Sequence, residues 1–249
     1  DLVTNGDFSQ EGSELITNGD FASPDISMIT GAGVRSIVNG ELKVEESGLN
    51  FSQVIYNNIL DSNKIYKATF DITLGTGSYN VYSTTNGNVV ITESGTHTFY
   101  LQNTNRFYVG SNGVGDVWYM DNVSVKEVGQ DWTLQSEWSI GTNKAIYDNS
   151  GSGNLNQSFT WQVGKKYKIT FDIGDFTTNK RFDIYSGVSF IKTATTDNNT
   201  SYTILFDGDG GSTFRFRGLT TESFSITNIS IIEITDDTNL PRIDYSPYS

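Results

Sequence analysis

Aromatic and planar polar side chains are the residues of this chain best suited to binding a ligand. Sugar rings present apolar C–H faces that pack on flat aromatic rings, and Asn, Gln, Asp or Arg side chains read their hydroxyls. Alternation with Phe214 and Phe216 places two arginines on the face away from the core, where they could meet acidic sugars or solvent. Aromatic residues are also common in sandwich cores, so both interpretations stay open. The candidates are Tyr79, Tyr82, Trp132, Trp138, Tyr185, Arg215 and Arg217.

Groups able to catalyse a reaction are scarce. The sequence has no cysteine and a single histidine, His97, which excludes thiolate chemistry and a multi-histidine zinc site and leaves a serine triad only one base. Glycoside hydrolysis needs two carboxylates that converge across a cleft. Glu45 and Glu46 are neighbours in a predicted strand and point to opposite faces, whereas Asp207 and Asp209 lie in a predicted hairpin turn. We therefore predict that the chain is not an enzyme.

The net charge of -13, with only 16 Lys and Arg residues, limits the partners of this chain. Nucleic-acid and anionic-membrane binding both need clustered cations, so neither is predicted. No apolar stretch reaches the roughly 18 residues that a transmembrane helix needs, so membrane insertion is not predicted. The first residues also lack the charged and apolar regions of a signal peptide.

Composition and alternation indicate an all-β protein. Glycine, asparagine, serine and threonine are abundant, which favours short strands joined by turns. Between Tyr66 and Ile72 every second residue is apolar and the residues between them are polar, so the apolar face is predicted to lie in the core. Runs of this kind recur at a spacing typical of a two-sheet sandwich.

An internal repeat organises the chain. The phrase Lys-x-Tyr-Lys-x-Thr-Phe-Asp-Ile occurs at Lys64–Ile72 and again at Lys165–Ile173, so the period is a little over 100 residues. A period of this length indicates duplication of a whole domain. We predict a first domain at 15–128, a second domain at 129–235 and an extended exit segment at 236–249.

The N-terminal end carries a shorter repeat. Leu2–Ser9 is echoed by Leu15–Ala22, although one copy is enough to start a domain. One interpretation is that residues 1–14 are a linker or the remnant of an upstream domain. The other is that two equivalent strands compete for one place, so that the spare strand pairs with a neighbouring subunit.

Three motifs occur in a characteristic order: Asn18-Gly19-Asp20-Phe21 at a domain start, the run Gly164–Asp172, and a closing strand that begins Asp121-Asn122-Val123-Ser124. With them the chain resembles tandem carbohydrate-binding modules of the cellulose and xylan binding type. More narrowly, it resembles the divergent modules of bacteriophage tail and virion appendage proteins. The phrase Leu240–Ser246 is similar to one that follows such modules in phage structural proteins.

The resemblance implies two tandem jelly-roll β-sandwich domains, each with sugar bound in a concave sheet face or at the loop tips. It also implies a structural Ca²⁺ ion between the opening segment and the closing strand, for which Asp20 and Asp121 would supply oxygen ligands in the first domain. The acidic residue usual after the opening Phe is replaced by Ser9 and Ala22, and Thr227 stands at the position matching Asp121. These departures restrict the calcium expectation to the first domain.

The leading expectation is a phage virion appendage protein, of fibre or tail type, that touches host glycans. It implies a virion-surface or extracellular location, other virion subunits as partners and a homo-oligomer. Two alternatives stay open. One is the carbohydrate-binding region of a secreted bacterial polysaccharide-degrading enzyme. The other is a purely structural filament or surface protein, assembled by strand exchange.

Overall fold

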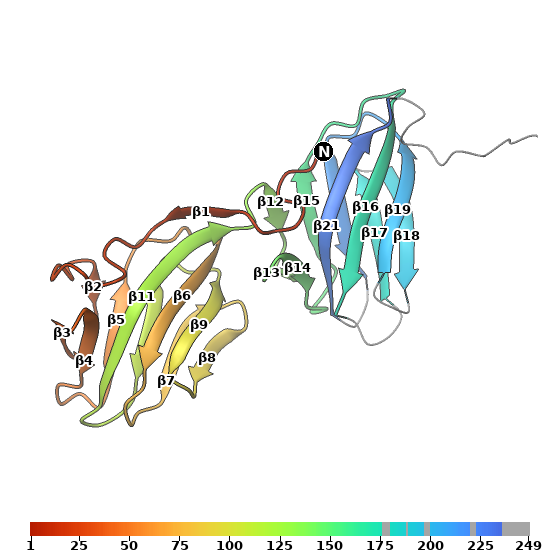
Figure 1. The fold of residues 1–249 in the computed structure, drawn as a ribbon. Coiled ribbons are helices and arrows are strands. Elements are labelled where there is room, and N and C mark those ends of the chain that lie inside the picture. The colour runs from red at the N-terminus through yellow and green to blue at the C-terminus, as the bar shows by residue number, and fades with distance from the viewer. Residues whose placement is uncertain (176–179, 188, 197–199, 220–222, 236–249) are drawn as a thin grey trace, which may run out of the picture. The chain divides into compact units, whose positions relative to one another are not determined.

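The structure is a computed structural model that describes residues 1–175, 180–187, 189–196, 200–219 and 223–235 (Figure 1). In this part of the chain every regular element is a β-strand. The all-β prediction is therefore confirmed. The predicted exit segment, 236–249, lies outside the described residues.

The chain forms two compact units whose boundaries differ from the predicted ones. The first domain is Glu11–Val128, and the second domain joins Asp1–Gln10 to the residues from Gly129 onward. The first domain is thus inserted between the opening segment of the second domain and the rest of it.

The first domain contains two layers of antiparallel strands. One layer has the order β2-β5-β10-β7-β8 and the other β9-β6-β11-β4-β3, with β1 paired to β11. Pairing of Thr84 with Leu101 joins β7 to β9 and links the layers into one hydrogen-bonded sheet. The strands are β1 (Glu11–Glu14), β2 (Ile29–Thr30), β3 (Val34–Val38), β4 (Glu41–Glu45), β5 (Ser52–Tyr56), β6 (Ile65–Thr73), β7 (Tyr79–Thr84), β8 (Gly87–Ile91), β9 (Gly95–Leu101), β10 (Phe107–Ser111) and β11 (Val117–Val128).

The second domain repeats this arrangement in two separate sheets. Their orders are β12-β15-β20-β17-β18 and β13-β14-β21-β16-β19. The strands are β12 (Trp132–Leu134), β13 (Trp138–Gly141), β14 (Lys144–Tyr147), β15 (Asn154–Ser158), β16 (Lys166–Gly174), β17 (Lys180–Ser186), β18 (Ser189–Thr196), β19 (Thr200–Asp207), β20 (Thr213–Gly218) and β21 (Phe224–Glu233). The order β5-β10-β7-β8 corresponds to β15-β20-β17-β18, as expected for a duplicated sandwich of the jelly-roll type.

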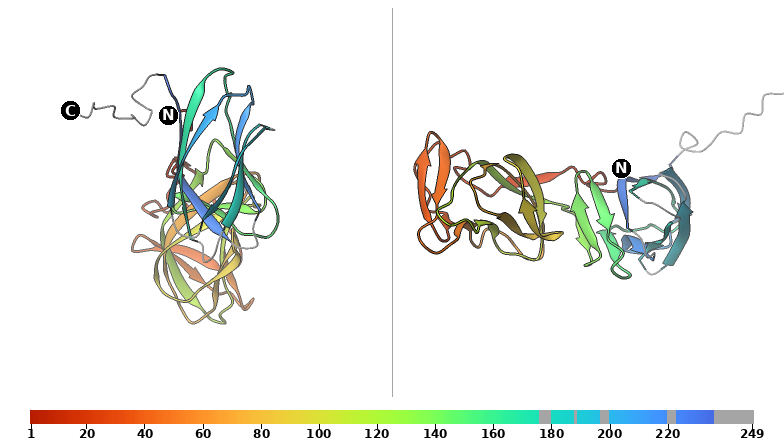
Figure 2. Two further views of the ribbon diagram at one scale, coloured as in Figure 1. Left: turned by 90° about the vertical axis from the view of Figure 1, so that its right-hand side faces the viewer. Right: turned by 90° about the horizontal axis from the view of Figure 1, so that it is seen from below.

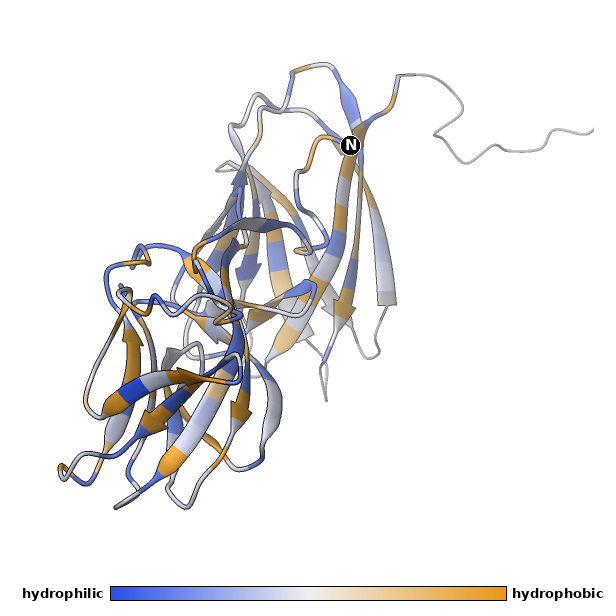
Figure 3. Cartoon of the chain, turned by 60° about the vertical axis from the view of Figure 1, so that its left-hand side comes forward, coloured by the Kyte–Doolittle hydropathy of each residue, from blue (hydrophilic) through white to orange (hydrophobic). Residues whose placement is uncertain are grey.

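Each core lies between the two layers and is rich in aromatic side chains. Along β6 buried and half-buried residues alternate, and Figure 3 shows the same alternation of apolar and polar residues in other strands. In the first domain Trp118 of β11 is fully buried, and its indole N–H donates to Ser52 Oγ of β5 at 2.8 Å. In the second domain Phe171 of β16 packs edge-on against Phe216 of β20, with centroids 4.9 Å apart. These contacts connect opposite layers.

The two copies of the N-terminal repeat hold equivalent places in the two domains. Ile229 N–H donates to Gly6 O at 2.9 Å in the second domain, and Val123 N–H donates to Gly19 O at 2.8 Å in the first. A Cβ atom on either glycine would lie 1.9 Å from the carbonyl oxygen of Ile229 or Val123. Only glycine allows the opening segment to approach the closing strand this closely.

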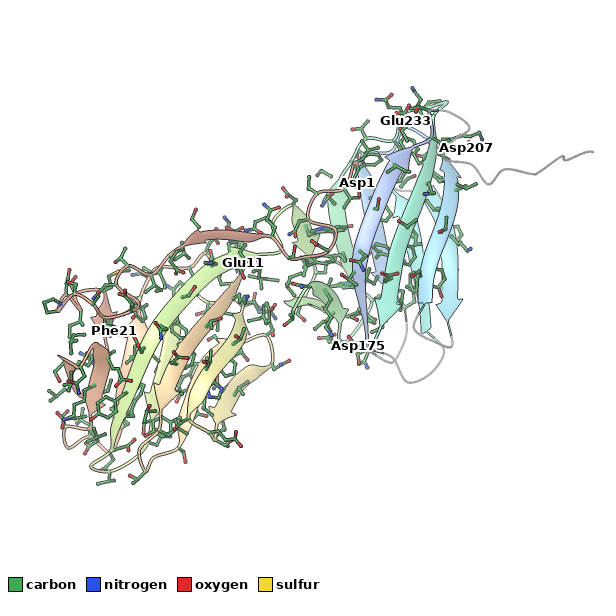
Figure 4. The ribbon with its side chains drawn as sticks, in the orientation of Figure 1. Asp1, Glu11, Phe21, Asp175, Asp207 and Glu233 are labelled. Atoms are coloured by element: carbon green, nitrogen blue, oxygen red, sulfur yellow. The ribbon has the colours of Figure 1, made fainter. Side chains whose placement is uncertain are left out.

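The phenylalanine of each copy anchors its segment. Phe8 and Phe21 are both buried, and both have the left-handed backbone conformation, with φ of 56° and 48°. Asp1 lies beside β21 (Figures 2 and 4), where its carboxylate accepts the Ile231 N–H at 3.0 Å. The prediction that residues 1–14 are a linker is therefore wrong. Strand exchange also loses its premise, because the two segments do not compete for one place.

Candidate functional site

Three of the predicted sugar platforms are buried. Tyr79 is 1% exposed and donates its hydroxyl to Asp116 Oδ2 at 2.5 Å. Trp138 is 2% exposed, packs against Phe224 and donates its indole N–H to Gly153 O at 3.0 Å. Neither residue can stack a sugar, because its ring is buried in the core.

Trp132 is buried for a different reason. Its ring lies 5.2 Å from that of Phe8, and its indole N–H donates to Asn5 O at 3.0 Å. Trp132 therefore anchors the opening segment of its own domain. The sequence could not show this, because the partners lie more than a hundred positions away in the chain.

Tyr82 belongs to an outward-facing group in the first domain, here called the tyrosine face: Gln53, Asn80, Tyr82 and Tyr108. The rings of Tyr82 and Tyr108 are stacked, with centroids 4.0 Å apart and an interplanar angle of 14°. The exposed guanidinium of Arg106 lies 5.4 Å from the Tyr108 centroid.

Gly110 lies between these side chains and leaves room for the rings. It pairs with Asn80 on one side and Gln53 on the other. A Cβ atom at Gly110 would come within 3.2 Å of the Tyr108 ring and 3.4 Å of the Tyr82 ring. The missing side chain therefore lets both rings lie close to the sheet.

The hydroxyl of Tyr108 is protonated and uncharged near neutral pH. Burial, followed by its contact with Tyr82, raises the pKa of Tyr108 to about 12. Gln53 Nε2 donates a hydrogen bond to this hydroxyl at 2.5 Å. The site can therefore offer an apolar ring surface together with hydroxyl and amide groups.

Tyr185, Arg215 and Arg217 come together in the second domain in a group here called the arginine face: Asn154, Asn156, Asp183, Tyr185, Arg215 and Arg217. Register places Asn156, Arg215 and Tyr185 in one row across β15, β20 and β17, and Asn154, Arg217 and Asp183 in the next. All of these side chains are half-buried except that of Asp183, which is buried.

The arginine face is connected by direct contacts. Arg215 Nε donates to Asn156 Oδ1 at 2.9 Å, and its guanidinium lies 5.7 Å from the Tyr185 centroid. The Tyr185 hydroxyl donates to Asp183 Oδ2 at 3.2 Å, and Thr193 Oγ1 donates to Asp183 Oδ1 at 2.6 Å. The prediction that both arginines lie away from the core is confirmed.

The two faces lie on corresponding strands, β5, β10 and β7 in the first domain and β15, β20 and β17 in the second. Sequence reasoning missed Tyr108, Gln53 and Asn156. A signal for Tyr108 exists, because it alternates with the buried residues Phe107 and Val109. No comparable signal marks the two amides, which are common residues in this chain.

The predicted calcium ligands each have a local partner. Asp20 Oδ1 accepts the Ala22 N–H at 3.3 Å, and Asp121 Oδ1 accepts the Asn122 N–H at 2.8 Å. Among the described residues no group of three or more His, Cys, Asp or Glu side chains could hold a metal ion. Two carboxylates and backbone carbonyls fit a weak Ca²⁺ site at most, so calcium in the first domain stays a prediction.

Other candidate groups are engaged in the fold. His97 Nε2 is hydrogen-bonded to Glu93 O at 2.9 Å, and the ring lies 6.3 Å from that of Phe70. Asp209 accepts a hydrogen bond from Ser186 and one from the Gly211 N–H, as a turn residue would. No helix long and apolar enough to cross a membrane occurs in the described residues.

No protein-family model matches the sequence, and no curated protein matches it. Among solved structures, the chain is similar to the tandem CBM22-1–CBM22-2 domain of Xyn10C from Paenibacillus barcinonensis, with 9% identity, 88% of this chain and 97% of that chain covered, and a TM-score of 0.37. Allantoicase from Saccharomyces cerevisiae has 11% identity, coverages of 91% and 92%, and a TM-score of 0.31. A structure of Sulfolobus Turreted Icosahedral Virus has 12% identity, coverages of 83% and 60%, and a TM-score of 0.25.

Proposed function

We propose that the chain is a non-enzymatic glycan-binding protein that binds sugar on the tyrosine face and on the arginine face. The observation that carries this proposal is that corresponding strands of the two domains both present tyrosine rings beside planar amide side chains. Core packing does not require these groups, because they lie on the outer side of their sheets. Sugar recognition does require such a combination.

The tyrosine face suits the apolar side of a sugar ring. The stacked rings of Tyr82 and Tyr108 provide a preformed surface, so little side-chain entropy is lost on binding. Gln53 and Asn80 border this surface and can pair with ring hydroxyls. Each site alone is expected to be weak, because it is an open sheet face.

In its biological setting the chain is proposed to belong to a phage virion appendage of fibre or tail type. There it would contact other virion subunits and copies of itself at the virion surface. Many linked copies raise the effective concentration of weak sites, so avidity can increase binding about 10²-fold without new contacts. The binding region of a secreted bacterial polysaccharide-degrading enzyme would use the same two faces.

Affinity electrophoresis through gels that contain plant, algal and bacterial-surface polysaccharides tests the proposal. We expect retardation in at least one gel, and we expect Tyr82→Ala combined with Tyr108→Ala to reduce it. Tyr119→Ala is the matched control, because Tyr119 is a half-buried tyrosine on the other layer of the first domain. Uniform migration of the chain in all gels would refute glycan binding and favour a purely structural role.

A further inference from the structure

We propose that the two faces differ in the charge of the sugar they bind, and that the arginine face takes an anionic glycan, carboxylated or sulfated. This inference rests on the proposed function and specifies its ligand class. The tyrosine face, whose four members are uncharged, would take neutral sugar.

The first argument is that the arginines are unusual cations in this chain. Every ion pair recorded between described residues is formed by a lysine, for example Lys67 with Glu11 at 2.6 Å and Lys165 with Glu233 at 2.7 Å. Arg215 and Arg217 form none with the described residues. In a chain of net charge -13, two adjacent arginines without such a carboxylate partner form a local cationic surface.

The second argument is that Asp183 neutralises this surface only in part. It stands opposite Arg217 in the strand register, but its two oxygens accept hydrogen bonds from Tyr185 and Thr193. The two rows hold two arginines and one aspartate, so the arginine face keeps a net positive charge. An anion on the face would add the missing negative charge.

The third argument is geometric. Asn156 holds Arg215 through Nε, and the Tyr185 ring lies beneath the guanidinium. Asn156 uses Nε of Arg215, so a ligand on this face would pair with the two Nη groups. A guanidinium fixed in this way can form a bidentate pair with a carboxylate or a sulfate.

Affinity electrophoresis with three polymers tests this inference. Polygalacturonate and its methyl-esterified form share a backbone and differ in charge, so comparing them tests the need for charge. Dextran sulfate tests whether a sulfate can replace the carboxylate. We expect at least one of the two charged polymers to retard the chain by binding the arginine face. The methyl ester is not expected to bind this face. Retardation should fall between about 0.02 M and about 0.5 M NaCl, because salt screens exposed charges. Arg215→Gln with Arg217→Gln should weaken binding about tenfold or more, as expected for loss of charged hydrogen bonds.

Arg106→Gln is the matched control, because Arg106 is an exposed arginine beside a tyrosine in the first domain. Arg215→Lys keeps the positive charge but loses the guanidinium geometry that allows bidentate pairing, so its binding should be intermediate between those of the wild type and the double variant. Unchanged far-UV circular dichroism and thermal unfolding would show that the variants fold. Equal losses for Arg106→Gln and the double variant would mean non-specific attraction and would overturn the inference. Retention by neutral glycans alone would overturn it while the proposed function stands, and no retention by any glycan would overturn both.

Discussion

Asn122 Nδ2 donates a hydrogen bond to Asp71 Oδ2 at 2.7 Å, and this pair links β11, the closing strand of the first domain, to β6, which carries the repeated motif. The second domain has the same pair, in which Asn228 donates to Asp172 at 2.6 Å. Both asparagines have left-handed φ angles, 51° and 53°, where the pairing with the neighbouring strand is irregular. The duplication therefore kept a bulge together with the side chain that stabilises it.

Replacement of Asn122 should show the cost of its backbone conformation. Asn122→Ala is expected to destabilise the first domain by about 1 kcal/mol more than Asn122→Gly, because alanine is disfavoured at positive φ whereas glycine is not. Both variants lose the hydrogen bond to Asp71. Hydrogen exchange resolved by peptide would assign the loss to the first domain. Equal stability of the two variants would show that the bulge rearranges.

Deletion of residues 1–10 should destabilise the second domain and leave the first unchanged. The deletion removes Val3 and Phe8 from the second core, and burial of one such side chain contributes about 1.5–3 kcal/mol. Differential scanning calorimetry with peptide-resolved hydrogen exchange would assign the effect. A synthetic peptide of residues 1–10 is expected to restore part of the lost protection.

Gly6→Ala and Gly19→Ala are the point variants for the same contacts. Each is expected to lower the stability of one domain by about 1–3 kcal/mol, since the new methyl group must displace the opening segment. Gly6→Ala should affect the second domain and Gly19→Ala the first, so that each variant is the control for the other. Loss of protection in the first domain on Gly6→Ala would contradict the observed assignment of the opening segments.

Acid should weaken the first domain through Asp116. Burial raises the pKa of this carboxyl group, but hydrogen bonds from Ser111, Tyr79 and the Thr76 N–H outweigh burial and lower the pKa below 3.8. The folded state therefore favours the charged form. The resulting stabilisation is present above the unfolded-state pKa near 3.8 and is lost as pH falls through the lower folded pKa.

Asp116→Asn tests this pH dependence. We expect it to destabilise the first domain by about 2 kcal/mol at neutral pH, because charged hydrogen bonds become neutral ones. We also expect a flatter dependence of urea unfolding on pH between about 2 and 5. A variant that keeps the wild-type slope in this range would show that other carboxyl groups cause the acid sensitivity.

Calcium should have a small effect, confined to the first domain. Two carboxylates suggest a dissociation constant of about 1 mM. A Ca²⁺ concentration about 10-fold above this constant would then add about 1.4 kcal/mol to the stability of that domain. Thermal unfolding with Ca²⁺ and with Mg²⁺ would measure this. Asp20→Asn with Asp121→Asn should abolish any difference, and a wild-type chain indifferent to Ca²⁺ would refute the site.

The all-β class and the outward direction of Arg215 and Arg217 could be predicted from the sequence, because the alternation of apolar and polar residues in a strand involves only near neighbours in the chain. The duplication could be predicted from the motif repeated at Lys64–Ile72 and Lys165–Ile173. Alternation does not tell which of two faces another layer covers. Tyr79 and Trp138 were therefore predicted as possible platforms and are instead core residues.

Features that depend on strand pairing between distant segments could be found only in the folded structure. The first copy of the N-terminal repeat completes a domain whose remaining strands begin after Gly129, and no local pattern records that partner. Likewise, Asn156, Arg215 and Tyr185 lie far apart in the chain and become neighbours only through the register of β15, β20 and β17. Sheet register is fixed by the burial of whole layers, which is a property of the folded domain rather than of any short segment.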